Sequence, residues 1–119
     1  MVSVLVVDDS AFMRDMIKNI LKDTDVEEVF EASDGEESVE KYKMTRPDIV
    51  FMDIMMPKMN GIDALKKIIG DDPSAKVIMC TSIGQEKIIS DAIEAGAKDF
   101  ITKPFKPEEI KAILEAHTD

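Results

Sequence analysis

Residues 4–10 of the chain read VLVVDDS, four apolar residues followed by two aspartates and a serine. Residues 49–52 (IVFM) and 77–80 (VIMC) are likewise apolar at every position. A run without polar alternation is typical of a strand that is covered on both faces, as in a parallel sheet. Residues 29–32 and 100–102 are weaker candidates, and the charged neighbours of the former indicate an edge strand.

Amphipathic stretches separate these runs and predict five helices. Ser10 is placed to cap the first helix, residues 34–37 resemble a capping box for the second, and Pro107 occupies the first turn of the fifth. Gly96 ends the fourth. The first helix has an apolar face from Met13 to Leu21, and its opposite side carries the charged residues Arg14, Asp15, Lys18 and Lys22. The second to fifth helices also have apolar residues at helical spacing. In chain order these are Val39 and Tyr42; Ile62, Leu65, Ile68 and Ile69; Ile88, Ile89, Ala92 and Ile93; and Ile110, Ile113 and Leu114.

Five strand–helix alternations predict an α/β fold with right-handed crossovers, a doubly wound (βα)5 sandwich with helices on both faces of a parallel sheet. The length of 119 residues suits one domain spanning 1–119, with no separate output domain. In such sheets, ligands bind at the carboxyl ends of the strands. The residues that follow each strand are therefore the candidates for function.

Composition excludes several classes of function. The chain has 25 acidic and 15 basic residues and a formal net charge of −10, which argues against non-specific nucleic-acid binding. Its single cysteine, Cys80, cannot form an internal disulfide and fits a reducing compartment. We find no signal peptide and no apolar run that approaches a membrane span, so we expect a cytoplasmic protein without membrane contact.

The carboxyl ends of four predicted strands bring polar residues to one edge of the sheet. Carboxylates that crowd together need compensation, and hard oxygen ligands of this kind suit Mg²⁺. A carboxylate can also attack a phosphoryl group, while a cation and a hydroxyl stabilise the transferring oxygens. The residues are Asp8, Asp9, Asp53, Thr81, Ser82 and Lys103.

Each of these residues also has a simpler interpretation on its own. The pair Asp8 and Asp9 could cap a helix, Asp53 could belong to a turn, and Lys103 could be a solvated surface lysine. Their joint occurrence at successive strand ends instead favours a metal-dependent phosphoryl-transfer site.

The chain resembles the receiver domain of two-component response regulators. The similarity lies in residues 6–10, 48–53, 56–61, 81–82 and 96–105, in the order and at the spacing of that family. The segment DDSAFMR at positions 8–14 most resembles chemotaxis regulators of the CheY type. The resemblance implies the flavodoxin-like strand order 2-1-3-4-5.

The resemblance also implies a role for each site residue. Asp53 would be the phosphoacceptor and Thr81 the switch hydroxyl. Lys103 would contact the phosphoryl group, and its peptide bond to Pro104 would be cis. Asp9 and Asp53 would bind Mg²⁺ (or Mn²⁺ as a substitute) directly, Asp8 largely through a water molecule, and the backbone carbonyl of Met55 would complete the site.

In this family the signal passes from the phosphoryl group to an aromatic switch residue, here Phe100. Movement of Thr81 would let the ring pack inward and remodel the face of the fourth helix, fifth strand and fifth helix. Phe100 stands where a Tyr is common in chemotaxis regulators, so it offers no hydroxyl to a partner. Met55 and Ile83, at positions that influence hydrolysis of the acyl phosphate, are apolar and predict slow self-dephosphorylation.

The implied partners are a histidine kinase of the chemotaxis type as donor and a flagellar motor-switch component or adaptor as target. We expect a monomer before phosphorylation, and no enzymatic activity beyond self-phosphorylation from a donor and autodephosphorylation. The alternative is a phosphorelay intermediate that passes its phosphate to a histidine phosphotransfer protein.

Two other classes of protein share features of the sequence. A flavodoxin-like electron carrier would need a Ser/Thr/Gly-rich phosphate loop after the first strand, where Asp8 and Asp9 would repel the flavin phosphate. A haloacid-dehalogenase-type phosphatase would need a second Asp two residues after Asp53, where this chain has Met55.

Overall fold

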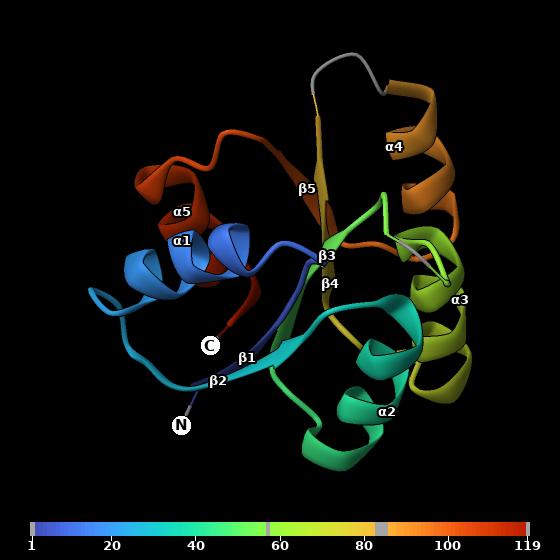
Figure 1. Cartoon of the computed structure of the whole chain (residues 1–119), viewed down its shortest axis with the longest axis horizontal. Coiled ribbons are helices and arrows are strands. Elements are labelled where there is room, and N and C mark those ends of the chain that lie inside the picture. Colours follow the sequence, from blue (N-terminus) through green and yellow to red (C-terminus); the bar gives the residue numbers. More distant parts are fainter. Residues whose placement is uncertain (1, 57, 83–85, 119) are drawn as a thin grey trace.

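Five strands alternate with five helices in the computed structural model, which describes residues 2–56, 58–82 and 86–118 (Figure 1). The strands are β1 (Val2–Val7), β2 (Val26–Ala32), β3 (Ile49–Asp53), β4 (Val77–Thr81) and β5 (Asp99–Thr102). The helices are α1 (Ala11–Leu21), α2 (Gly35–Thr45), α3 (Gly61–Asp71), α4 (Glu86–Glu94) and α5 (Pro107–His117). None of the described helices is long and apolar enough to cross a membrane.

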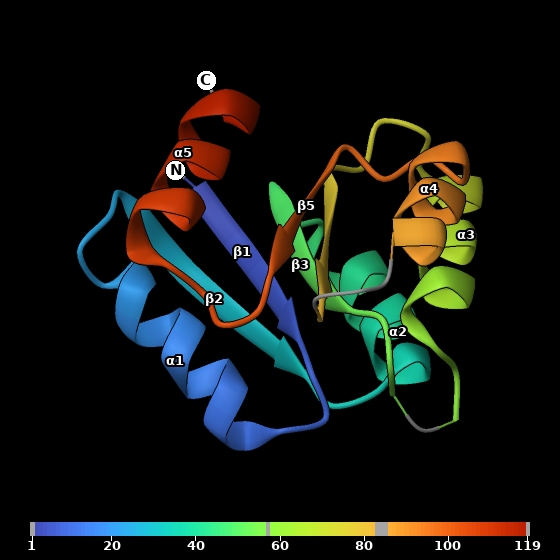
Figure 2. The ribbon, with the colours of Figure 1, turned by 90° about the horizontal axis from the view of Figure 1, so that it is seen from above.

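The strands form one parallel sheet in the order β2-β1-β3-β4-β5, as predicted. Helices α1 and α5 cover one face of the sheet, and α2, α3 and α4 cover the other (Figures 1 and 2). Each face has its own apolar core, since alternate residues of a strand point to opposite sides. Leu5 and Val7 pack with α2 and α3, while Val4 and Val6 pack with α1 and α5.

The helix caps follow the sequence signals closely. The Ser10 hydroxyl accepts a hydrogen bond from the Met13 backbone N–H, and the Asp34 carboxylate accepts one from that of Glu37. The capping box is modified, because the Glu37 carboxylate reaches back to the N–H of Ser33 rather than to that of Asp34. Both helices therefore begin where the pattern predicts, within one residue.

Two elements differ from the sequence prediction. Strand β2 begins at Val26 rather than at residue 29, because Val26 and Glu28 pair with Val2 and Ser3 of β1 at the edge of the sheet, with an irregularity in the register between them. The apolar face of α4 is only partly covered. Of its four apolar residues, Ala92 is buried, whereas Ile93 is 45% exposed.

Candidate functional site

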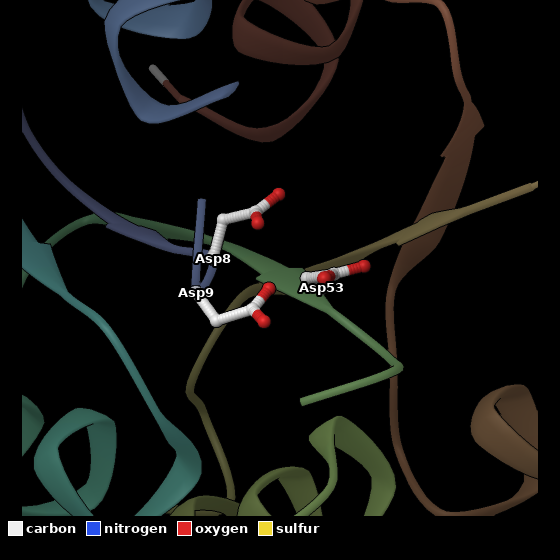
Figure 3. Close-up of side chains that lie close together, drawn as sticks. All are labelled: Asp8, Asp9 and Asp53. Atoms are coloured by element: carbon white, nitrogen blue, oxygen red, sulfur yellow. The ribbon is translucent and has the colours of Figure 1, made fainter. Parts of the chain in front are cut away.

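Three carboxylates meet where β1 and β3 end side by side. Asp8 and Asp9 follow β1, and Asp53 is the last residue of β3. One oxygen from each side chain lies within 4.8 Å of the others. Figure 3 shows the three side chains directed toward a common space beyond the strand ends. The convergence expected from parallel strands is therefore present in the structure.

Lys103 provides the positive charge of the site from the other end of the chain. Its Nζ lies 3.2 Å from Asp8 Oδ2 and 3.3 Å from Asp53 Oδ1. Burial alone would lower the pKa of the Lys103 ammonium, but the Asp53 and Asp8 carboxylates raise it above its ordinary value. Lys103 is therefore a permanently charged group held between two carboxylates, and not a solvated surface lysine.

The surroundings of Asp53 disfavour the ionised form of its carboxyl. Burial, with the negative charges of Asp8 and Asp9, raises the pKa of the Asp53 carboxyl, and Lys103 offsets this only in part. The side chain is 9% exposed. A buried carboxylate with a raised pKa and a nearby cation is typical of a functional rather than a structural group.

The raised pKa predicts that Asp53 destabilises the fold at neutral pH. A carboxyl that binds protons more tightly in the folded state favours folding less as the pH rises through its pKa. We expect Asp53→Asn to increase the free energy of unfolding by about 1–2 kcal/mol at neutral pH without divalent ions. Denaturant unfolding would measure this, and the gain should shrink as the pH falls and the wild-type carboxyl becomes protonated. A variant less stable than wild type at neutral pH would contradict the prediction.

Asp8 belongs to the site and does not cap α1, whose N-cap is Ser10. Its Oδ1 accepts a hydrogen bond from the Ser10 N–H at 2.9 Å, and its Oδ2 faces Lys103. The Asp8 N–H donates to the Ala32 carbonyl of β2, which continues the sheet pairing beyond the end of β1. Asp8 is 2% exposed, whereas Asp9 is exposed and free to reach an ion. The two aspartates therefore differ in role although they are adjacent.

The segment after Asp53 is held close to the strand end by Gly61. A Cβ at Gly61 would collide with the carbonyl oxygen of Asp53, so only glycine permits this approach. The Gly61 N–H donates to the Ile54 carbonyl at 2.8 Å, and the Asn60 side chain caps α3 through the Asp63 N–H. Lys58 has a left-handed backbone conformation with φ of 67°, and its Nζ lies 3.6 Å from Asp34 Oδ2. These contacts hold Ile54 and residues 58–61 near the end of β3.

The remaining predicted residues occupy three parts of the fold. Thr81 ends β4 and is buried, with its hydroxyl donating to the Ser82 carbonyl at 3.3 Å. Phe100 lies on β5 and is 40% exposed. Met55 lies two residues after Asp53 and is 65% exposed, and Ile83 lies outside the described residues.

The Lys103–Pro104 peptide bond is cis. Cys80 is buried within β4, where burial raises the pKa of its thiol.

The donor set fits a small divalent cation. Three carboxylate oxygens from two adjacent strand ends are hard ligands, and one exposed and two buried aspartates leave part of the coordination shell to water. Such an ion would also offset the burial and the negative charges of Asp8 and Asp9 that together raise the pKa of the Asp53 carboxyl. Asp8, Asp9 and Asp53 would hold Mg²⁺ here.

Sequence reasoning missed one residue at the site, Arg14. Its helical position suggests a solvated polar face, yet its guanidinium donates to the Asp8 backbone carbonyl at 2.6 Å. The sequence indicates this contact only weakly, because the sole signal is an arginine in the first turns of the helix that follows the two aspartates.

A doubly wound parallel sheet with an acidic cluster and a lysine at its carboxyl edge defines the receiver class of signalling domains. The family model described as "Response regulator receiver domain" matches residues 4–115, and the chain belongs to this family.

Within the family, the chain is of the CheY type. It is 55% identical over 115 residues to "Chemotaxis protein CheY" of Listeria monocytogenes, covering 97% of each chain. It is 56% identical over 111 residues to the protein of that name from Thermotoga maritima, covering 93% of this chain and 92% of the relative. Among solved structures, "Crystal structure of the CheX-CheY-BeF3-Mg+2 complex from Borrelia burgdorferi" matches with a TM-score of 0.91 and 38% identity, covering 97% of this chain and 87% of that one.

Proposed function

We propose that this chain is a signalling switch that is activated by phosphorylation of Asp53. The observation that supports this most strongly is the buried Asp53 carboxylate, which lies 3.3 Å from Lys103 and within the acidic cluster. A histidine kinase of the chemotaxis type is the proposed donor. Similarity to chemotaxis proteins supports a role in the same process.

The residues of the site divide the reaction among them. An Asp53 carboxylate oxygen attacks the phosphorus of phosphohistidine, so that a P–O bond forms, the P–N bond breaks, and the electron pair leaves with the imidazole. Lys103 neutralises negative charge on the transferred group, and the Thr81 hydroxyl donates to one of its oxygens. Mg²⁺, held by Asp8, Asp9 and Asp53, would supply further charge neutralisation.

The proposed output is a change in the face formed by α4, β5 and α5. Phosphorylation adds charge at the end of β3, next to the end of β4, and Thr81 and Phe100 would communicate it to that face. Ile93 on α4 supports this choice because it is partly exposed and a protein partner could cover it. Phe100 on β5 is also partly exposed, and its ring would turn inward on activation. A motor-switch component or adaptor is the proposed target.

Intact mass spectrometry tests the proposed function. The chain would be incubated with Mg²⁺ and a small acyl-phosphate donor, and separately with a phosphorylated chemotaxis kinase. A gain of the mass of one phosphoryl group, dependent on Mg²⁺, supports the proposal. No gain with either donor would overturn it. Affinity capture with and without a phosphoryl mimic would then identify the target, and capture of a histidine phosphotransfer protein would indicate the relay function instead.

Slow loss of phosphate is a separate prediction about this switch. Met55 is apolar and cannot orient a water molecule for attack on the phosphoryl group, and Ile83 is apolar too. We expect the double variant Met55→Asn, Ile83→Glu to lose phosphate about tenfold faster, a smaller gain than the roughly 10²–10⁴-fold that a well-placed general acid or base contributes. Decay of the phosphorylated mass after donor removal measures the rate. An unchanged rate would refute the idea, and Met44→Asn is a control because Met44 is an exposed methionine of α2.

A further inference from the structure

One guanidinium joins the acidic site to the edge strand of the sheet. Arg14 lies on α1 with its side chain 17% exposed. Its Nη1 donates to the backbone carbonyl of Asp8 at 2.6 Å, and its Nε donates to Glu31 Oε1 at 3.0 Å. Glu31 belongs to β2, so the arginine connects a helix, the end of β1 and a neighbouring strand.

Glu31 holds the guanidinium in place. Its second carboxylate oxygen lies 3.0 Å from Lys18 Nζ, and its backbone carbonyl accepts a hydrogen bond from Lys41. Burial would raise the pKa of Glu31, but Lys18 and Arg14 keep it below its ordinary value. Glu31 is therefore ionised at neutral pH, and Arg14 is oriented by the charged hydrogen bond that it donates to this carboxylate, which is itself held by Lys18.

The Asp8 carbonyl controls the geometry of the acidic cluster. The N–H of Asp8 pairs with Ala32 of β2, so the peptide before Asp8 is fixed by the sheet. The peptide after it connects Asp8 to Asp9 and is planar. Holding its carbonyl oxygen therefore fixes the plane and the direction in which the Asp9 backbone continues. Asp9 is the exposed member of the cluster, so the position of its side chain depends most on the direction of its backbone.

We propose that Arg14, oriented by Glu31, is a positioning residue for the divalent-cation site. By holding the Asp8 carbonyl it sets the place of the Asp9 carboxylate relative to Asp8 and Asp53. The inference rests on the proposed function for its biological meaning, but its physical content is cation affinity.

The positive charge of Arg14 and its contact with the Asp8 carbonyl predict opposite effects of Arg14 on Mg²⁺ affinity. If its charge were the main effect, removing a cation near three carboxylates would strengthen binding of Mg²⁺. If positioning is the main effect, removing the guanidinium weakens binding, because supporting contacts to metal ligands are worth about 10–100-fold in affinity. The sign of the change therefore separates the two effects.

The test is the affinity of Mn²⁺, followed by the electron paramagnetic resonance signal of the free ion, and of Mg²⁺ by competition. We expect Arg14→Met to weaken binding about tenfold. Arg14→Lys keeps the charge but has one terminal nitrogen in place of the guanidinium fork, and should also weaken binding. Lys22→Met is the control, since it removes a positive charge from the exposed C-terminal end of α1, away from Asp8 and Glu31, and should change affinity by less than about twofold.

The inference would be overturned if Arg14→Met bound the ion as tightly as the wild type or more tightly, or if Lys22→Met weakened binding as much as Arg14→Met. Thermal unfolding of each variant shows whether it is folded at the temperature of the titration. If Arg14→Met is unfolded there, Arg14→Lys decides alone, and wild-type affinity in that variant overturns the proposal. A wild-type chain that binds Mn²⁺ but accepts no phosphate would refute the proposed function and leave this inference standing. A wild-type chain that binds neither ion would refute the inference.

Discussion

Asp53→Asn should abolish phosphorylation of the chain by a small acyl phosphate. The substitution keeps the size of the side chain and an oxygen that can accept from Lys103, 3.3 Å away in the wild type. It removes the nucleophile, because a carboxamide oxygen carries no full negative charge. We expect the initial rate to fall by at least about 10³-fold, as when a catalytic nucleophile is removed from an enzyme. Intact mass against time measures both proteins under the same Mg²⁺ and donor concentrations.

The control for this experiment is Asp91→Asn, which makes the same chemical change on the exposed surface of α4. It should accept phosphate at the wild-type rate. A full phosphoryl mass on Asp53→Asn would show that another residue is the acceptor, with Asp8 and Asp9 as the nearest carboxylates. The denaturant unfolding of Asp53→Asn described above shows whether the variant is folded under the conditions of the phosphorylation experiment.

The fold could be predicted because its strongest signals are local. Residues 4–7, 49–52 and 77–80 are apolar throughout, and all are buried in the three central strands. The errors fall at the edges of the sheet and on the surface. Strand β2 contains the exposed residues Glu27 and Glu28, of which Glu28 pairs with β1, so its first residues carry no hydrophobic pattern. The α4 face reads as core by its spacing, yet nothing in the described part of the chain fully covers Ile93.

The candidate site was predictable to the level of its residue types. Parallel strands bring their carboxyl ends together, which places Asp8, Asp9 and Asp53 at one edge without any knowledge of loops. The support of the site was not predictable in this way. Gly61 is needed because of a close approach to the Asp53 carbonyl, and Arg14 acts on a backbone carbonyl. Backbone contacts leave no pattern of side-chain types, so only coordinates reveal them.

Asp9→Asn should weaken Mg²⁺ binding about 100-fold or more. Asp9 is the exposed carboxylate of the cluster, whereas Asp8 is engaged by Ser10 and Lys103. Replacing it removes one negative charge and one anionic ligand, which should cost at least as much as loss of a supporting contact. Titration calorimetry or competition with Mn²⁺ measures the dissociation constant. The phosphorylation rate at low Mg²⁺ should fall in parallel, because the site would be mostly empty.

Saturating Mg²⁺ distinguishes a ligand from a structural residue. If Asp9 acts by holding the ion, raising the Mg²⁺ concentration should restore much of the phosphorylation rate in Asp9→Asn, since the Asp53 nucleophile and Lys103 are intact. Asp63→Asn, which removes a carboxylate outside the cluster from the first turn of α3, should keep wild-type affinity. An Asp9→Asn variant with unchanged affinity would place the ion on other groups. A variant that binds Mg²⁺ weakly and stays inactive at saturation would show that Asp9 also shapes the surroundings of Asp53, as its contribution to the raised pKa of that carboxyl suggests.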